Sequence, residues 1–313
     1  MRFLSPRTDF VFKRVFASAE SHDILLSFLN AILELKPPRL ITSVTIIDPY
    51  IAPKIKGMKD SYVDVRVVDQ SLREYIIEMQ VLNAPGFEKR VLYNACKTYA
   101  GQIQMGDQYR ELTGVVAITI TDFVMFPTLP RIVNRFMLRA DTNADIALED
   151  LELVFAELPK LTKDEEHLVD TVEKWLYFLK HADDVQGVPP ALAAEPAIRH
   201  AFDLVNRAGY TQEELDIQMR REDFIYLQRE SINFAAEKGY ERGLAEGRAE
   251  NRAEERAEGR REEKAQLLLR LLEKRFPGPP AWDRDRILAA TPEALDQGLD
   301  RALTAASLDE VFA

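Results

Sequence analysis

Residues 62–81 read YVDVRVVDQSLREYIIEMQV and predict a β-hairpin at the centre of the fold. Apolar and polar residues alternate in both halves, and the DQSL between them is typical of a turn. The apolar faces of the two strands must point the same way, and a slip of one residue would turn every side chain over. The register that pairs Val65 with Ile77, with residues 70–72 as the loop, satisfies this condition and places Asp64 opposite Glu78.

Two facing carboxylates are unusual in a buried strand pair because they repel each other. At a separation of about 4 Å and an effective dielectric constant near 20, the repulsion is on the order of 4 kcal/mol. A fold tolerates the pair if one acid is protonated, if a cation such as Arg66 neutralises it, or if a divalent metal ion lies between the acids. Alternatively, this face is the solvated side of an antiparallel sheet, where acids are common.

The composition limits the possible classes of protein. The chain has 313 residues, of which 46% are hydrophobic and 30% charged, as in soluble globular proteins. It contains neither an apolar run near the roughly 20 residues of a spanning helix nor a signal-peptide pattern, so we expect a cytoplasmic protein without membrane association. A single cysteine, Cys96, excludes an internal disulfide, and the four histidines have no cysteine partners for a zinc cluster. Any bound metal would therefore have oxygen ligands.

The net charge of −11 is unevenly distributed. Residues 1–130 contain 15 Lys and Arg against 14 Asp and Glu, whereas the remainder contains 26 against 38. The acidic balance argues against a general polyanion binder, but the hairpin lies in the nearly neutral part. The segment from Lys54 to Arg90 holds seven basic residues, which suits a phosphate-facing patch and is also a normal surface density.

Residue spacing predicts the elements around the hairpin. Helical periodicity covers residues 8–17, 21–35 and 87–103, and strands are predicted over 40–50 and 113–126. The strand over 113–126 is almost continuously apolar, so we expect helices on both faces of a mixed sheet. In the helix over 87–103, we expect Cys96 in the apolar stripe and Arg90, Tyr93, Asn94 and Lys97 on the polar side.

Residues 237–264 form a charged array with a period of four, in which Gly, Ala, Glu and Arg each recur. This period exceeds 3.6, so each stripe of side chains winds around the helix, and like charges lie four residues apart. An isolated helix of this kind is marginally stable. The array is therefore interpreted either as a stalk for self-association or as a solvated tether.

The motifs resemble those of a known nuclease superfamily. An acid in one strand, Glu-x-Gln in its partner and a following helix with Arg, Tyr and Lys resemble the PD-(D/E)XK core in its Glu-x-Gln variant. More specifically, TDFVFKRVF, VDVRV, IEMQV and EKRVLYNACKTYAGQI resemble the recombination-promoting nuclease and transposase family. The resemblance implies an α/β fold with a restriction-endonuclease-like mixed sheet flanked by helices and followed by helical segments.

The residue patterns and the resemblance together predict a domain plan. The nuclease core is expected over residues 1–130, followed by a helical extension over 131–236 and a charged helical linker over 237–264. Residues 265–313 resemble a small helical domain of unknown function that is often appended to such proteins.

By the same resemblance, Asp64 and Glu78 are Mg²⁺ (or Mn²⁺) ligands, with the backbone carbonyl of Met79 as a third. Gln80 completes the expected catalytic set, although the general pattern has lysine at this position. A lysine would supply charge at the phosphate, whereas glutamine forms only hydrogen bonds. The expected DNA contacts are Lys13, Lys89, Arg90, Tyr93 and Lys97.

The main functional hypothesis is a Mg²⁺-dependent phosphodiesterase, a DNA endonuclease acting in recombination or transposition. The alternative is a catalytically weak or inactive nuclease-fold module that binds DNA or protein and self-associates through residues 237–264. Glutamine at position 80 favours the alternative, and the presence of both Asp64 and Glu78 favours the enzyme. A third, purely structural hypothesis makes both acids ordinary surface residues.

Overall fold

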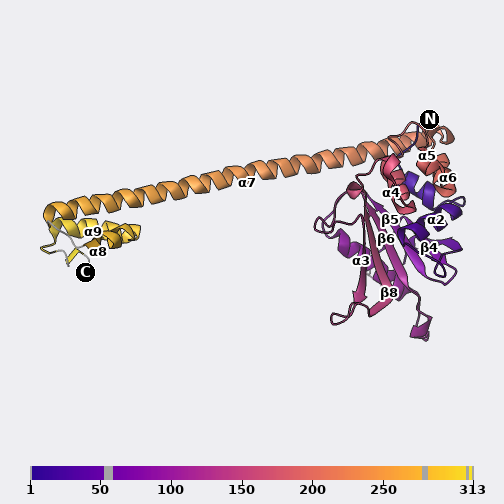
Figure 1. Cartoon of the computed structure of the whole chain (residues 1–313), viewed down its shortest axis with the longest axis horizontal. Coiled ribbons are helices and arrows are strands. Elements are labelled where there is room, and N and C mark those ends of the chain that lie inside the picture. Colours follow the sequence, from indigo (N-terminus) through magenta and orange to yellow (C-terminus); the bar gives the residue numbers. More distant parts are fainter. Residues whose placement is uncertain (1, 53–58, 277–280, 308–309, 312–313) are drawn as a thin grey trace. The chain divides into compact units, whose positions relative to one another are not determined.

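The computed structural model describes residues 2–52, 59–276, 281–307 and 310–311 (Figure 1). The chain divides into two compact units, Met1–Glu230 and Ser231–Ala313. In the described part of the chain, no helix has both the length and the apolar character needed to cross a membrane.

Among the described residues, six strands of the first unit form one mixed sheet. The order across the sheet is β1 (Val44–Ile47), β4 (Val65–Asp69), β5 (Glu74–Gln80), β6 (Val115–Thr121), β8 (Ala147–Glu157) and β7 (Val133–Arg139). The pairs β5/β6 and β6/β8 are parallel, and the remaining neighbours are antiparallel. A separate antiparallel pair consists of β2 (Tyr50–Ile51) and β3 (Ser61–Tyr62).

Helices cover both faces of the sheet, as the apolar strand predicts. Every residue of β6 is buried. Figure 1 shows α3 (Phe87–Gly101) on one side of the sheet, where it packs on Ile76 and Ala117. The opposite side carries a larger core with Phe12 and Trp175, built by α1 (Asp9–Phe16), α2 (His22–Ile32), α4 (Thr171–His181), α5 (Pro190–Ala193) and α6 (Pro196–Leu204).

The predicted hairpin register is confirmed where β4 and β5 pair. Val65 lies opposite Ile77 and Val67 opposite Tyr75, and all four side chains are buried. The loop closes through Leu72, whose φ of 62° is left-handed. Alternation with a period of two therefore predicts which side chains reach the core.

Before Val65 the predicted pairing is wrong. Asp64 lies in a bend, and Tyr62 pairs with Tyr50 in the small sheet instead of with β5. The Asp64 carboxylate accepts the Met79 N–H at 2.9 Å, so a side chain takes the place that a strand carbonyl would occupy. Asp64 and Glu78 are consequently not a cross-strand pair.

Two further predictions require correction. Residues 131–236 are not helical throughout, because β7 and β8 complete the sheet within this range. In α3 the buried stripe contains Val91 and Thr98, and Cys96 is exposed whereas Asn94 and Lys97 are buried. The helix is turned relative to the predicted stripe because Phe87 and Val91 dock on the sheet.

Short 3₁₀ turns connect the elements of the first unit: η1 (Tyr109–Glu111), η2 (Leu158–Lys160), η3 (Glu165–His167) and η4 (Arg207–Gly209). The long helix α7 (Gln212–Arg275) begins in this unit and continues into the second. It includes the charged array over 237–264, whose side chains are almost all exposed. The array is thus helical, and its role as stalk or tether stays a prediction.

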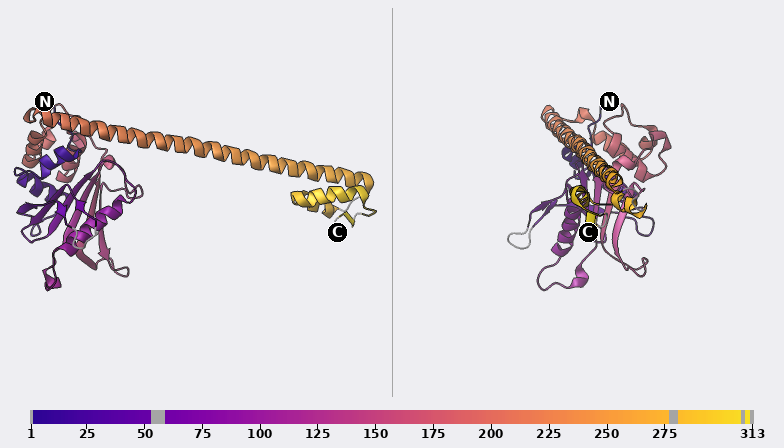
Figure 2. Two further views of the ribbon diagram at one scale, coloured as in Figure 1. Left: turned by 180° about the vertical axis from the view of Figure 1, so that it is seen from behind. Right: turned by 90° about the vertical axis from the view of Figure 1, so that its left-hand side faces the viewer.

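The second unit has a small helical core of its own. Figure 2 shows α8 (Ala281–Leu288) and α9 (Pro292–Thr304) beside the end of α7. Leu268 and Leu272 of α7 pack with Ile287 and Leu295. A Cβ atom at Gly298 would lie 2.8 Å from a Leu268 methyl carbon, so glycine permits this close helix contact.

Candidate active site

Asp64 is held beside the end of β5 by contacts from two elements. Its Oδ2 accepts the Met79 N–H at 2.9 Å, and its Oδ1 lies 3.7 Å from the Lys13 Nζ of α1. Burial raises the pKa of the Asp64 carboxyl, while the Met79 N–H and Lys13 oppose this shift. The carboxylate is therefore fixed in orientation and only partly neutralised.

Glu78 projects from β5 on the face that α3 covers and is 9% exposed. Its Oε1 lies 3.4 Å from the Arg90 Nη2. Burial raises the pKa of Glu78 to about 7, with a further increase from repulsion by Asp64 and a decrease from Arg90. The two acids thus interact electrostatically at one end of the sheet, and a cation between them would relieve the repulsion.

This pKa predicts how the stability of the metal-free protein depends on pH. Folded Glu78 holds a proton up to about pH 7, whereas the unfolded chain releases it near 4.5. The free energy of unfolding should therefore fall as the pH rises through this window. Glu78→Gln should reduce this fall in the free energy of unfolding between pH 5 and pH 8 by on the order of 2–3 kcal/mol. Urea unfolding at pH 5 and pH 8 measures it, and an equal effect of the substitution at both values would contradict the prediction.

Arg90 connects Glu78 with Gln80. The Gln80 Oε1 accepts a hydrogen bond from Arg90 Nη2 at 2.7 Å, and the Gln80 Nε2 donates to the Leu82 carbonyl at 2.7 Å. The guanidinium lies over the Phe87 ring, 4.8 Å from its centroid. One oriented cation therefore lies beside the position where the general motif has lysine.

The other residues predicted to contact DNA do not lie at one common surface. Lys89 and Tyr93 line a pocket of about 620 Å³ together with Arg90 and Glu78. Lys13 lies next to Asp64, on the α1 side. Lys97 is only 5% exposed, and its Nζ donates to the backbone carbonyls of Ile51 at 2.6 Å and Lys59 at 2.7 Å. Lys97 therefore holds the small sheet in place and does not line this pocket.

The donor set fits a hard divalent cation. Within the described residues, no group of three or more His, Cys, Asp or Glu could hold a metal ion. The Asp64 carboxylate accepts the N–H of Met79, the residue after Glu78, so the two acids lie at the same end of β5. Mg²⁺ is commonly bound by one or two carboxylates and retains several waters, so two neighbouring carboxylates are sufficient. Both acids have raised pKa values, and a bound cation would favour their ionised forms.

The family model for PD-(D/E)XK nuclease family transposases matches residues 6–235 of the chain. The chain belongs to this family. Comparisons with curated proteins and with solved structures found no match. The nuclease-family assignment confirms the resemblance in the motifs and the restriction-endonuclease-like fold class. The family match extends well past residue 130 and includes β7, β8 and the start of α7.

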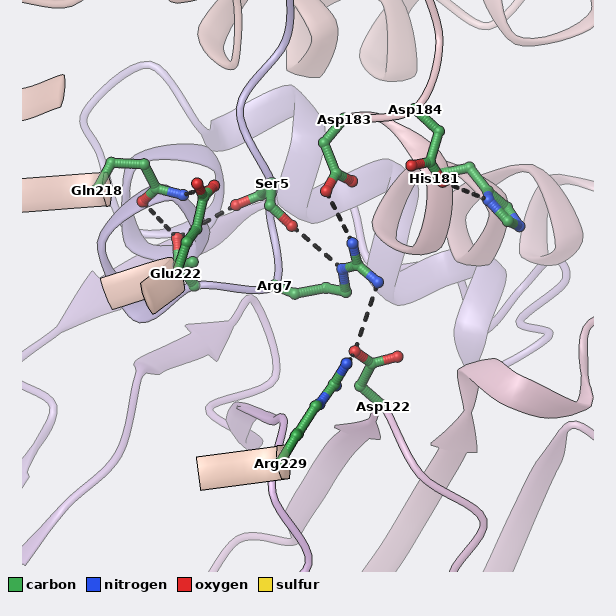
Figure 3. Close-up of polar contacts among 10 residues, drawn as sticks. Ser5, Arg7, Asp122, His181, Asp183, Asp184, Gln218, Glu222 and Arg229 are labelled. Atoms are coloured by element: carbon green, nitrogen blue, oxygen red, sulfur yellow. Dashed lines mark hydrogen bonds and ion pairs between the residues drawn. The ribbon is translucent and has the colours of Figure 1, made fainter. Parts of the chain in front are cut away.

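An ion cluster adjoins the site of this nuclease-family chain and was not predicted from the sequence. The Asp122 N–H donates to the Gln80 carbonyl at 2.9 Å, directly after β6. The Asp122 carboxylate forms ion pairs with Arg7, at 3.5 Å, and with Arg229 of α7 (Figure 3). Arg7 also binds Asp183 at 2.8 Å. The cluster anchors the start of α7 beside the candidate active site.

A local signal for Asp122 exists in the sequence. It directly follows the apolar run VVAITIT, and polar residues at the carboxyl end of a buried parallel strand commonly face a site. Its arginine partners have no such signal, because they are separated from it by 115 and 107 residues.

Proposed function

We propose that this nuclease-family chain is a DNA endonuclease that requires a divalent cation. The observation that supports it is the pair formed by half-buried Asp64 and buried Glu78, whose carboxyl groups interact electrostatically at the end of the sheet, where the Arg90 guanidinium contacts Glu78. Two carboxylates beside a fixed cation suit a phosphodiester, which needs charge neutralisation and an activated water. Asp64 and Glu78 are the proposed metal ligands, with the Met79 carbonyl as the third.

The residues of the chain have separate tasks in this proposal. Bound Mg²⁺ or Mn²⁺ would supply Lewis acidity toward the phosphate and the attacking water. The Met79 N–H orients the Asp64 carboxylate, so the ligand is in place before the cation arrives. Gln80 holds Arg90, whose guanidinium stabilises negative charge on the phosphate and thus takes over the role of the motif lysine.

The proposed substrate is DNA, and the proposed setting is recombination or transposition in the cytoplasm. Lys13, Lys89, Arg90 and Tyr93 are accessible for contacts with the phosphate backbone or bases. Such contacts neutralise phosphates, so binding should weaken as the salt concentration rises.

A plasmid-nicking assay tests the proposal. Purified full-length protein is incubated with supercoiled plasmid in Mg²⁺, in Mn²⁺ and in excess chelator. We expect nicked and linear products with either metal and none with chelator. Equal nicking in the presence of chelator would contradict a metal-dependent mechanism.

The second candidate function is a nuclease-fold binding module with little or no cleavage, and Gln80 in place of lysine favours it. The two proposals differ in one measurement. A binding module retards DNA in a gel shift with Mg²⁺ but leaves the plasmid supercoiled, whereas an enzyme converts it.

Residues 237–264 are the proposed site of homo-oligomer formation. Deletion of 237–313 should lower the mass in solution to that of a smaller assembly, because the exposed helix and its charge stripes are lost. Plasmid nicking should persist, since Asp64 and Glu78 belong to the first unit. Light scattering measures the assembly, and an unchanged oligomeric state after truncation would favour the tether.

A further inference from the structure

We infer that the pocket beside Glu78 receives an unpaired nucleotide, so that DNA with a single-stranded segment is the preferred substrate. This inference rests on the proposed nuclease function and specifies its substrate class. The pocket measures about 620 Å³ and is lined by residues of β3, β5 and α3. A pocket of this volume is in the range of small-ligand sites and is large enough for one nucleotide.

The walls of the pocket combine aromatic rings with basic side chains. Tyr62 is 71% exposed, and it lines the pocket together with Tyr93 and the buried Phe87. Its basic residues are Lys59, Lys89 and Arg90. Aromatic faces that stack on bases, together with cations that follow the backbone, characterise proteins that bind single-stranded nucleic acid. In a continuous duplex both faces of each base are already stacked and cannot meet an aromatic ring.

Tyr62 is held in a fixed position before any substrate arrives. Its ring lies against Tyr50, with 4.8 Å between the centroids, and the Tyr50 hydroxyl donates to Asp60 at 2.8 Å. The buried Lys97 ammonium donates to the carbonyl of Ile51 in β2 and to the carbonyl of Lys59, which lies two residues before β3. A buried ammonium is costly unless it is hydrogen-bonded, so these bonds tie Lys97 to the backbone. The aromatic wall is thereby preorganised, which reduces the entropy lost on binding.

The lining of the pocket includes a buried polar group for which the described residues provide no hydrogen-bond partner. Asn94 of α3 is 3% exposed and lines the pocket. Among the described residues, its Oδ1 has no hydrogen-bond partner, which is uncommon for a buried polar atom. An unpaired base presents N–H donors at its edge, and such a donor would satisfy this oxygen. A duplex base has already used its pairing edge.

Glu78 lines the same pocket, so the unpaired nucleotide would lie beside the proposed metal ligand. The pocket would hold the base while the attached phosphate reaches the Arg90 guanidinium between Glu78 and Gln80. Cleavage would then occur next to the unpaired position.

Binding can be measured without cleavage. The probe is a single-stranded oligonucleotide that carries one 2-aminopurine, mixed with full-length protein in excess chelator. We expect quenching of its fluorescence on binding, because the base stacks on Tyr62. Tyr62→Ala should weaken binding roughly ten- to hundredfold, as expected for loss of one base–aromatic stack. Tyr62→Phe should retain the affinity, since the ring remains.

Tyr109→Ala is the matched control, because Tyr109 is 83% exposed and lies in η1, outside the pocket. Its affinity should equal that of the wild type. Equal affinity of wild type and Tyr62→Ala for the single strand would overturn the inference, as would tighter binding of a continuous duplex than of the single strand.

The cleavage assay separates this inference from the proposed nuclease function. In Mg²⁺ we expect faster cleavage of a gapped duplex than of the same duplex without the gap. Equal rates on both substrates would overturn the single-strand preference and leave the nuclease intact. Quenching by Tyr62 without cleavage of any DNA would support the pocket and overturn the nuclease.

Discussion

Asp64→Asn and Glu78→Gln should each reduce Mg²⁺-dependent plasmid nicking by about a hundredfold or more, the largest loss expected for any substitution. Each change removes one anionic ligand while preserving the size of the side chain. The Asp64 position should be maintained, because the amide oxygen of asparagine can still accept the Met79 N–H. Single-turnover nicking at saturating protein measures the chemical step, and thermal unfolding verifies that both variants remain folded.

Glu111→Gln is the matched control for the loss of one acid. Glu111 is exposed in η1 and has no contact with Asp64 or Glu78 among the interactions of the described residues. Its nicking rate should equal that of the wild type. If purified Asp64→Asn or Glu78→Gln cleaves at the wild-type rate, the ligand assignment is wrong.

Gln80→Lys should lower the nicking rate roughly tenfold to a hundredfold, although it restores the lysine of the general motif. In the structure the Gln80 Oε1 lies 2.7 Å from the Arg90 Nη2. An ammonium at this position would repel the guanidinium and displace it from Glu78. Gln80→Ala should also reduce the rate, because it removes the acceptor that orients Arg90. Single-turnover cleavage of supercoiled plasmid by the wild type and both variants measures these effects.

Rates that do not fall in these variants would contradict the proposed role of Gln80. A higher rate for Gln80→Lys would indicate a weakened enzyme whose main task is binding, in which the added charge stabilises the phosphate. A wild-type rate for Gln80→Ala would remove Gln80 from the site. Gln104→Lys adds the same charge at an exposed position outside the pocket, and it controls for a general increase in DNA affinity.

The sequence by itself determined the central hairpin and the buried strand beside it. Alternation of apolar residues excluded every register that is out of step by one residue, because such a register exposes one apolar face. Among the remaining registers, the three-residue loop over 70–72 selected the pairing of Val65 with Ile77. The continuous apolar run of β6 required helices on both sides of the sheet, and the structure has them. The order of the motifs also indicated the nuclease family, which the family match confirms.

Only the tertiary structure decided how the acids of the candidate site are held. The alternation around Asp64 continues without a break in the sequence, yet the strand ends there because the carboxylate takes the Met79 N–H. Local periodicity predicts which face of a strand each side chain lies on. It does not predict a hydrogen bond from a side chain that competes with the pairing of the strands. The direct cross-strand pairing of Asp64 with Glu78 was therefore wrong, whereas their electrostatic interaction is present.

The rotation of α3 and the anchoring of α7 likewise depend on distant contacts. Polar and apolar residues are mixed around α3, so periodicity did not reveal that Lys97 is buried beneath the small sheet while Arg90 joins Glu78 and Gln80. The ion pair between Asp122 and Arg229 spans 107 residues of chain. The pattern of apolar residues in a sequence predicts which side chains of one helix or strand are buried. The partner of a buried charge is determined only when separate elements pack together.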